Sequence, residues 1–391
     1  MRALPWNRAR TLAAELATPP PPENVPIGDA AGRVLAEPLR ALVAVPGFDN
    51  AAMDGYAVRG AGPWRLTGRV LAGCPDPGAL AERTAVEIAT GAPVPAGADR
   101  VVPYEEANRE GGLVAIRADA GRAWVRDHIR RRGEDAEPGD ELLPAGSLVT
   151  PVVLGMAGSV GADTVSVVPR PRARVLLTGD EIVRAGLPGP GQVRDALGPL
   201  LPPLLAGFGA DVTGVSVVGD ASAAALTAAL AATTEEIAVV CGASSVGPVD
   251  HLHAALAGLV ATVHVNGVAC RPGRPQVLAH RPDRGTDTGW IVGLPGNPYA
   301  ALVAAYTLLA PLVAGLTGRG LPGLPTVAVS GQARPVPGLT RLVPVRWDDS
   351  GAVVVPRDGA GYLGAAAQAD ALAVIEPDWT PHAPARLILQ C

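Results

Sequence analysis

Short apolar runs alternate with segments of helical apolar spacing between residues 172 and 320. The runs are 175–177, 212–218 and 237–240, and the helical segments are 196–208 and 221–232. An apolar run without polar interruption, such as 237–240, is typical of a strand that is covered on both faces. The alternation therefore predicts a doubly wound α/β domain built on a parallel sheet.

Three loops follow strands of this predicted sheet, at residues 178–181, 241–250 and 294–298. The carboxyl ends of parallel strands meet at one edge, which is where such sheets bind ligands. We therefore expect the three loops to converge on a binding site. Most loops of this kind, taken alone, are only tight turns, so their convergence carries the prediction.

The second and third loops contain groups that suit an anion. Backbone N–H groups of the second loop favour negative charge, Ser244 and Ser245 supply hydroxyl groups, and Asp250 supplies a metal ligand or hydrogen-bond acceptor. In the third loop, Asn297 is placed as an N-cap with Pro298 at the first helical position. This pattern predicts a second helix N-terminus that faces an anion.

The rest of the chain divides around this domain. Residues 43–128 consist of short apolar runs separated by Gly, Pro and Asp, which predicts an inserted β-rich domain. Residues 321–391 show the same texture and predict a small β-barrel-like C-terminal domain. Residues 1–42 and 129–171 flank the inserted domain, and we expect them to form one discontinuous linker domain. Within the first segment, residues 27–41 have apolar residues at helical spacing. The α/β domain then occupies residues 172–320.

Two loops of the inserted domain are dense in special residues, at positions 46–57 and 90–106. Asp54 and Thr90 in these loops are candidate ligand-binding residues. Asp-Gly is also ordinary turn chemistry, so each residue taken singly has a structural explanation.

Composition narrows the class of protein. The chain has 391 residues, a net charge of −5 and a pI of about 5.7, so nothing favours nucleic acid or an anionic membrane as a partner. The four cysteines have neither disulfide nor metal spacing, which makes the reducing cytoplasm the expected location. All 32 Lys+Arg positions are Arg.

Residues 298–318 carry no charge and are long enough to cross a bilayer. Pro311 interrupts this stretch and a capped turn begins it, so we expect a buried core helix rather than a membrane span.

Other common sites find little support. His251 and His253 have the spacing of a ligand pair, but no further Cys, His or carboxylate completes a tetrahedral site. A kinase-type phosphate loop with Gly-Lys-Ser/Thr is absent from the sequence.

Eight short motifs follow one another along nearly the whole chain. They are Ala-Gly-Arg-Val-Leu-Ala-Glu at 31–37, Phe-Asp-Asn at 48–50 with Met-Asp-Gly-Tyr-Ala at 53–57, Thr-Gly-Ala-Pro at 90–93, Gly-Glu-Asp at 133–135, Thr-Gly-Asp-Glu at 178–181, Ser-Val-Gly at 245–247 with Asp250, Arg-Pro-Gly-Arg-Pro at 271–275, and Leu-Pro-Gly-Asn-Pro at 294–298. In this order they resemble the motifs of the molybdopterin molybdenumtransferases, a family that includes the cofactor-forming domain of gephyrin.

The resemblance implies a four-part architecture and an activity. The parts are the discontinuous linker domain, the inserted β-rich domain, the doubly wound domain and the C-terminal β domain. The implied assembly is an elongated homodimer whose cleft lies between the α/β domain of one subunit and the inserted domain of the other. The implied reaction inserts molybdate into adenylylated molybdopterin with Mg²⁺-assisted release of AMP. Other molybdenum-cofactor proteins are possible partners.

The resemblance also assigns roles to residues. The implied catalytic residues are Asp54, Thr90, Glu181 and Asp250. The implied metal ligands are Asp180, Glu181, Asp195 and Asp250. The implied binding residues are Asp135, Thr178, Gly179, Gly242, Ser244, Ser245, Gly247, Arg271, Arg274, Pro295, Gly296 and Asn297. These types suit the task, because molybdate and pyrophosphate need cations and backbone N–H groups, and Mg²⁺ prefers carboxylate oxygens.

Several positions depart from the family pattern. Ala51, Leu197, Gly219 and Ala243 stand where the family usually has Ser, Asn, an acid and Gly, and Arg271 and Arg274 stand where it usually has Lys. The first four departures together motivate a second hypothesis, a pterin-binding or scaffold protein without turnover. A third is insertion of a related anion such as tungstate.

Overall fold

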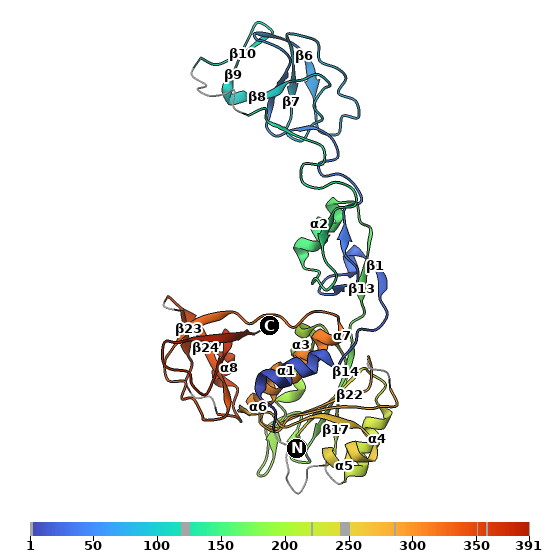
Figure 1. Cartoon of the computed structure of the whole chain (residues 1–391), viewed down its shortest axis with the longest axis vertical. Helices are drawn as coiled ribbons and strands as arrows, with labels where there is room; N and C mark the ends of the chain where they lie inside the picture. Colours follow the sequence, from blue (N-terminus) through green and yellow to red (C-terminus); the bar gives the residue numbers. More distant parts are fainter. Residues whose placement is uncertain are drawn as a thin grey trace.

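The computed structural model describes residues 3–118, 126–219, 222–242, 251–284, 287–349, 351–356 and 359–390. The molecule is elongated, with the inserted domain at one end and the α/β and C-terminal domains together at the other (Figure 1). The linker domain lies between these two ends.

The α/β domain is built on a six-stranded sheet in the order β17-β14-β18-β22-β21-β19. Its parallel strands are β14 (Arg172–Thr178), β17 (Asp211–Val218), β18 (Ile237–Cys241) and β22 (Trp290–Leu294), and its antiparallel strands are β21 (Val277–His280) and β19 (Thr262–Asn266). The doubly wound sheet is confirmed. The expected parallel pairing holds for β14, β17, β18 and β22, whereas β19 and β21 pair antiparallel, because short connections rather than crossover helices lead through them to β22.

Helices cover both faces of this sheet. On one face lie α3 (Leu197–Phe208), α6 (Pro298–Ala304) and α7 (Ala310–Leu316), and on the other lie α4 (Ala223–Ala232) and α5 (Leu252–Gly258). Strand β14 divides its side chains between the two cores, with Val175 and Leu177 on the first side and Leu176 on the second. This alternation is the two-residue period of a strand buried on both faces.

The uncharged stretch from Pro298 forms one continuous helix, in which a π-helical segment (Ala305–Leu309) joins α6 to α7. This helix, Pro298–Leu316, is apolar and long enough to cross a membrane, but 89% of its most apolar window is buried inside the protein. It is therefore a core helix, as expected. Pro311 does not interrupt it, because the π-helical turn before Pro311 rearranges the hydrogen bonds that proline would break.

Helix α1 (Trp6–Glu15) corrects the expected division of the chain. It was expected within the linker domain, but it packs along α7, and Trp6, Ala9 and Ala13 belong to the core of the α/β domain. A Cβ added at Gly315 would lie 2.4 Å from the carbonyl oxygen of Ala14, so the two helices touch through their backbones. This packing is a long-range contact that local apolar spacing does not specify.

The linker domain combines segments from either side of the inserted domain. Its strands are β1 (Glu23–Pro26), β2 (Val34–Leu35), β3 (Leu39–Arg40), β12 (Glu141–Leu143) and β13 (Thr164–Val168), and its helices are α2 (Pro151–Ser159) and a 3₁₀ turn (Ile27–Asp29). Strand β13 pairs with both β1 and β2, which joins the two segments. The helix expected over residues 27–41 is wrong, because these residues form the 3₁₀ turn and two short strands.

The inserted domain is a six-stranded sheet in the order β8-β5-β7-β6-β10-β9. Its strands are β5 (Gly55–Val58), β6 (Trp64–Val70), β7 (Thr84–Ile88), β8 (Arg100–Pro103), β9 (Ala107–Glu110) and β10 (Leu113–Ile116), with a 3₁₀ turn (Tyr104–Glu106) between β8 and β9. At its base, β4 (Asn50–Ala51) pairs with β11 (Ile129–Arg130).

The C-terminal domain is a closed five-stranded barrel. Its strands are β23 (Thr326–Ser330), β24 (Thr340–Asp348), β25 (Gly351–Val354), β26 (Ala371–Ile375) and β27 (Pro384–Leu389), and it carries one short helix, α8 (Gly364–Ala367). The strand β20 (Cys270–Arg271), from the α/β part of the chain, adds to β24 with Arg271 opposite Arg341. The barrel is therefore tied directly to the strand-end loops of the neighbouring sheet.

Candidate active site

Two adjoining cavities lie at the carboxyl edge of the α/β sheet. The strand-end cavity has a volume of about 580 Å³ and contains Thr178, Glu181 and Asp195 in its wall. The arginine-loop cavity has a volume of about 420 Å³ and is lined by Arg271 and Arg274. Gly242, Gly296 and Asn297 line both cavities, and Pro295 lines the arginine-loop cavity. The three predicted loops therefore do converge, as far as the structure describes them.

Backbone contacts form the floor of the strand-end cavity. Thr178 ends β14, and its buried hydroxyl group donates a 3.0 Å hydrogen bond to the carbonyl oxygen of Cys241. Gly242 follows with φ +103, and a Cβ there would lie 2.7 Å from the carbonyl oxygen of Thr178. A Cβ at Gly296 would lie 3.4 Å from Cα of Gly242. The loops can approach a ligand this closely only because glycine stands at these positions.

A small two-stranded ribbon carries the acidic side of this cavity. Its parallel strands are β15 (Ile182–Val183) and β16 (Val193–Arg194), with Glu181 just before the first and Asp195 just after the second, and both acids line the cavity. The side chain of Asp195 is only 6% exposed. Its Oδ1 accepts hydrogen bonds from the backbone N–H groups of Leu197 (3.0 Å) and Gly198 (2.8 Å). Asp195 therefore caps helix α3 while facing the cavity.

The thiol of Cys241 lies beneath this acidic wall. Burial raises the pKa of Cys241, and the negative charge of Asp195 raises it further. The thiol therefore stays protonated at neutral pH and acts as a small apolar group in the floor.

Gly179, Asp180 and Glu181 are consecutive, but their positions relative to the cavity differ. A Cβ added at Gly179, whose φ is +138, would lie 2.7 Å from Glu181 Oε2, so the Glu181 carboxylate folds back over this glycine. Asp180 does not line either cavity among the described residues, and its carboxylate lies near Gly219.

The arginine loop is held from below by a buried glutamine. Gln276 donates from Nε2 to the carbonyl oxygen of Gly273 (2.6 Å) and to the sulfur of Cys270 (3.2 Å). Gly273 has φ +89, and a Cβ there would lie 2.9 Å from the carbonyl oxygen of Ala300. Arg271 and Arg274 are exposed, and within the described residues neither forms an ion pair with a carboxylate. Both guanidinium groups are free to bind an anion.

The N-terminus of α6 does not offer free N–H groups to an anion, contrary to the expectation from Asn297 and Pro298. The backbone N–H groups of Tyr299 and Ala300 donate to the carbonyl oxygen of Ala360, at 3.0 and 3.3 Å. Asn297 occupies the N-cap position as expected, without a side-chain capping hydrogen bond. The C-terminal domain thus occupies this helix end and contributes Ala360 and Gly361 to the cavity walls.

Comparisons with known proteins agree with this arrangement. A family profile described as "MoeA N-terminal region (domain I and II)" matches residues 4–161, and one described as "Probable molybdopterin binding domain" matches residues 174–315. A molybdopterin molybdenumtransferase of Haemophilus influenzae is 33% identical over 326 residues, which cover 81% of this chain and 78% of that protein. The chain belongs to the molybdopterin molybdenumtransferase family.

Other relatives extend the comparison. Molybdopterin molybdenumtransferase 1 of Mycobacterium tuberculosis is 30% identical over an alignment of 417 positions, gaps included, which covers 96% of this chain and 95% of that protein. A solved molybdopterin biosynthesis protein from Pyrococcus horikoshii superposes with a TM-score of 0.75 at 25% identity, covering 100% of both chains. A second solved structure from that organism gives a TM-score of 0.80 at 20% identity, covering 99% of this chain and 100% of that chain, and supports the fold alone.

The inserted domain, which contains the predicted site residues Asp54 and Thr90, lies at the opposite end of the molecule from the α/β domain (Figure 1). Asp54 Oδ1 accepts hydrogen bonds from the backbone N–H of Thr90 (2.6 Å) and from its hydroxyl group (2.9 Å). The backbone N–H first, and then the hydroxyl group, hold the pKa of Asp54 below its usual value. Asp54 is therefore an exposed, ionised carboxylate. One chain does not bring it to the strand-end cavity.

Asp135 lies at the base of the inserted domain, where its Oδ2 accepts a 3.0 Å hydrogen bond from Arg130. It lines neither of the two cavities described above. Ser244, Ser245, Gly247 and Asp250, together with Ala243, lie outside the described residues.

The described residues contain no group of three His, Cys, Asp or Glu side chains that could hold a metal ion. Two carboxylates, Glu181 and Asp195, nevertheless line one cavity. Mg²⁺ is commonly held by one or two carboxylates together with substrate phosphates. This donor pair therefore fits a magnesium ion that a pyrophosphate would help to hold.

The sequence did not point to the ribbon β15–β16 or to residues 360–361 as parts of the site. The ribbon is too short for a periodic signal. Ala360 and Gly361 come from a separate domain, and only the long-range packing brings them to the cavity. Asp195 was named only through the family resemblance, as an implied metal ligand, although its position just before the predicted helix is also that of a cap.

Proposed function

We propose that this protein inserts molybdate into adenylylated molybdopterin and releases AMP, forming molybdenum cofactor. The observation that carries the proposal is the pair of adjoining cavities at the strand ends, one with Glu181 and Asp195 in its wall and one lined by Arg271 and Arg274, in a chain of the molybdopterin molybdenumtransferase family.

The arginine loop has the chemistry to hold the anionic groups. Arg271 and Arg274 present guanidinium groups without carboxylate partners among the described residues, and a planar guanidinium binds an oxyanion through paired N–H groups. Gly273 and Gln276 fix the loop that carries them. We assign these two arginines to molybdate or phosphate binding.

The strand-end cavity has the chemistry for the nucleotide part of the substrate. Thr178, Gly242 and Gly296 form a close backbone floor, against which a phosphate can pack. We assign Glu181 and Asp195 to Mg²⁺. When bound, the ion neutralises charge on the pyrophosphate as AMP leaves. Asp250 remains a further candidate ligand.

We also propose that the active form is a cytoplasmic homodimer. The Asp54–Thr90 pair is remote from the cavities of its own chain, so a partner subunit has to supply it if it takes part in the reaction. Exposed apolar side chains support an interface on the linker and inserted domains. Val152 is 80% exposed and Leu42 is 62% exposed, and Val43, Phe48 and Met53 are also exposed.

The departures from the family pattern give no positive support to the scaffold hypothesis. Ala51 is buried in β4, where its backbone pairs with Ile129. Leu197 is buried in the core of the α/β domain and keeps its backbone N–H on Asp195. The two replacements therefore fit the packing around them.

The test is a direct assay of AMP release. Purified protein, adenylylated molybdopterin and Mg²⁺ are mixed with molybdate, and we expect AMP and molybdenum cofactor to form together. Tungstate in place of molybdate measures the anion preference. Tight binding of adenylylated molybdopterin without AMP release, under conditions in which a related enzyme turns over, would instead identify a pterin-binding protein.

A further inference from the structure

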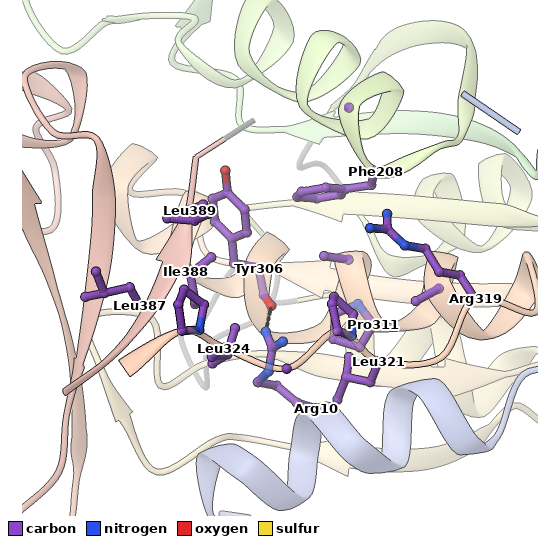
Figure 2. A pocket seen from close by; sticks show the side chains of 16 residues that line it. Arg10, Phe208, Tyr306, Pro311, Arg319, Leu321, Leu324, Leu387, Ile388 and Leu389 are labelled. Atoms are coloured by element: carbon purple, nitrogen blue, oxygen red, sulfur yellow. Dashed lines mark hydrogen bonds between the residues drawn. The ribbon is translucent and has the colours of Figure 1, made fainter. Parts of the chain in front are cut away.

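A separate cavity lies at the seam between the α/β and C-terminal domains (Figure 2). This seam cavity has a volume of about 270 Å³. Its walls come from α1, the end of α3, the helix from Tyr306 to Ala314, the connection around residues 319–325 and the end of β27. None of these residues lines the strand-end or arginine-loop cavity, so the seam cavity is not part of the site described above.

Apolar and aromatic groups form most of the seam cavity. Phe208 and Tyr306 make an edge-to-face pair with ring centroids 5.3 Å apart. Leucines from β27 and from the connecting segment line the remaining walls. The chain has only two Phe and five Tyr, so two of its few aromatic rings stand here. Such a lining suits a flat apolar body.

A buried cation faces this cavity. Arg10 is only 6% exposed, donates from Nη1 to the carbonyl oxygen of Tyr306, and lies 4.9 Å above the ring of Trp6. Within the described residues Arg10 forms no ion pair with a carboxylate. Burial, and then the positive charge of Arg386, lower the pKa of Arg10 to about 10. Arg10 therefore remains charged at neutral pH, and the described part of the chain gives it no carboxylate partner, which is costly for a buried cation.

A second cation stands across the cavity. Arg319 extends toward Phe208 in Figure 2, and within the described residues it has no ion-pair partner. Arg386, by contrast, is paired with Glu376. The sixteen described lining residues include these two arginines and no acid. The charges of the cavity are therefore complementary to one small anion.

We propose that the seam cavity binds a small aromatic carboxylate, whose ring packs against Phe208 and Tyr306 and whose carboxylate is held by Arg10 and Arg319. The volume limits the ligand to one or two rings, because drug-sized ligands occupy cavities of roughly 300–1,000 Å³. The walls belong to both domains, so a bound ligand ties the barrel to the α/β domain. The same barrel supplies Ala360 and Gly361 to the active-site cavities.

The experiment is a calorimetric titration of the full chain with 2-naphthoate, compared with the neutral isostere 2-naphthamide. We expect the carboxylate to bind, and the amide to bind at least about tenfold more weakly, because charge-assisted hydrogen bonds to guanidinium are lost. Saturating molybdate is expected to leave naphthoate binding unchanged, since the seam cavity is separate from the active site.

Variants locate the binding. Arg319→Gln and Arg10→Met are each expected to weaken naphthoate binding about tenfold or more. Arg319 is only partly buried, so its variant keeps the test valid if Arg10→Met impairs folding. Arg65→Gln, an exposed arginine of the inserted domain, is the matched control and is expected to leave affinity unchanged.

Three outcomes would overturn the proposal. The first is no binding of 2-naphthoate at about 1 mM, a concentration that detects a dissociation constant in the millimolar range. The second is equal affinity for the amide, or unchanged affinity in Arg319→Gln. The third is displacement of naphthoate by molybdate, which would place the ligand in the active site.

Discussion

At the residue scale, Gly242 determines how closely the strand-end floor can pack. Its φ is +103, and an added Cβ would lie 2.7 Å from the carbonyl oxygen and 2.9 Å from the hydroxyl group of Thr178. Gly242→Ala must move one of these groups. We expect it to lower the initial rate of AMP release by about tenfold or more, since strain and clashes of this kind cost about 1–3 kcal/mol.

Gly28→Ala is the matched control for Gly242→Ala. Gly28 has no heavy atom within 4 Å of an added Cβ and no positive φ, and it lies in the linker domain. We expect its rate to equal that of the unaltered protein. An equal loss in both variants, or no loss in either, would show that Gly242 does not shape the site.

Residue-level prediction from sequence worked best where a strand end fixes the position. Thr178, Glu181 and Gly242 were found because parallel strands bring their ends to one edge. The same reasoning failed for the N-terminus of α6, because the acceptor for its N–H groups, Ala360, comes from another domain. It also could not separate Asp180 from Glu181, because consecutive residues of a loop point in directions that no sequence period describes.

At the element scale, a hydrogen bond between two side chains helps to join α1 to the long core helix. Trp6 Nε1 donates to Thr307 Oγ1 at 3.0 Å, and both side chains are buried. Thr307→Val keeps the volume but leaves the indole N–H without its acceptor. We expect a loss of about 1–3 kcal/mol in the free energy of unfolding, measured by chemical denaturation.

A double variant tests whether the lost hydrogen bond is the cause. In a Thr307→Val background, Trp6→Phe is expected to cost less than it does in the unaltered chain, because the unpaired N–H has gone. Thr164→Val, on the exposed side of β13, is the control and is expected to change stability little. Additive effects of the two buried substitutions would refute the assignment.

A second element-scale prediction concerns the opposite edge of the α/β sheet. Glu235, just before β18, accepts hydrogen bonds from Arg174 of β14 and Thr213 of β17. Burial would raise the pKa of Glu235, but these hydrogen bonds outweigh it and lower the value to about 2. The unfolded chain protonates near 4.5. The stabilisation is therefore present above about pH 4.5 and is lost as the pH falls toward 2.

Glu235→Gln isolates this effect. At neutral pH we expect the variant to be less stable than the unaltered protein by roughly 1–3 kcal/mol, and we expect the difference to shrink as the pH falls from about 4.5 to about 2. Denaturation at several pH values measures it, with Glu110→Gln on the exposed strand β9 as control. A difference that stayed constant across this range would exclude the carboxylate as its source. AMP release at neutral pH should be unaffected, because Glu235 lies away from the active-site edge.

Helices and strands could be predicted where the hydrophobic pattern continued through the whole element. The runs that form β14 and β18 and the helices α3 and α4 were recognisable from sequence. Residues 27–41 were not, because their spacing fits a helix although the chain forms a 3₁₀ turn and short strands that pair with β12 and β13. The antiparallel β19 and β21 were missed for a related reason: a strand's direction depends on its connections rather than on its own residues.

At the scale of the whole molecule, sequence gave the architecture but not the packing between its parts. The four-part division follows from texture and motif order. The docking of α1 on α7 and the addition of β20 to the barrel are contacts between segments far apart in sequence. Local patterns carry no signal for such contacts. Contacts of this kind matter for function, since long-range packing also brings Ala360 and Gly361 of the C-terminal domain to the active-site cavities.

The elongated shape also leads to a test of whether the active site is shared between subunits. Asp54→Ala disables the inserted-domain side and Glu181→Gln disables the strand-end side, and each homodimer is expected to be inactive. In a mixed dimer of a symmetric assembly, one of the two sites receives both substitutions and the other receives neither. Co-expression of the two variants is therefore expected to restore about a quarter of the normal rate of AMP release.

In the control for this mixing experiment, the Asp54→Ala chain is co-expressed with a chain that carries Thr90→Val. Both substitutions lie in the inserted domain, where the two side chains are hydrogen-bonded to each other, so every site of every dimer keeps one defect. This mixture should stay inactive. If activity recovers only in the first mixture, the intact inserted domain of one chain must act on the intact strand-end cavity of the other chain. A failure to recover activity, with dimers verified by sedimentation, would place Asp54 and Glu181 in the same subunit's site and contradict the shared arrangement.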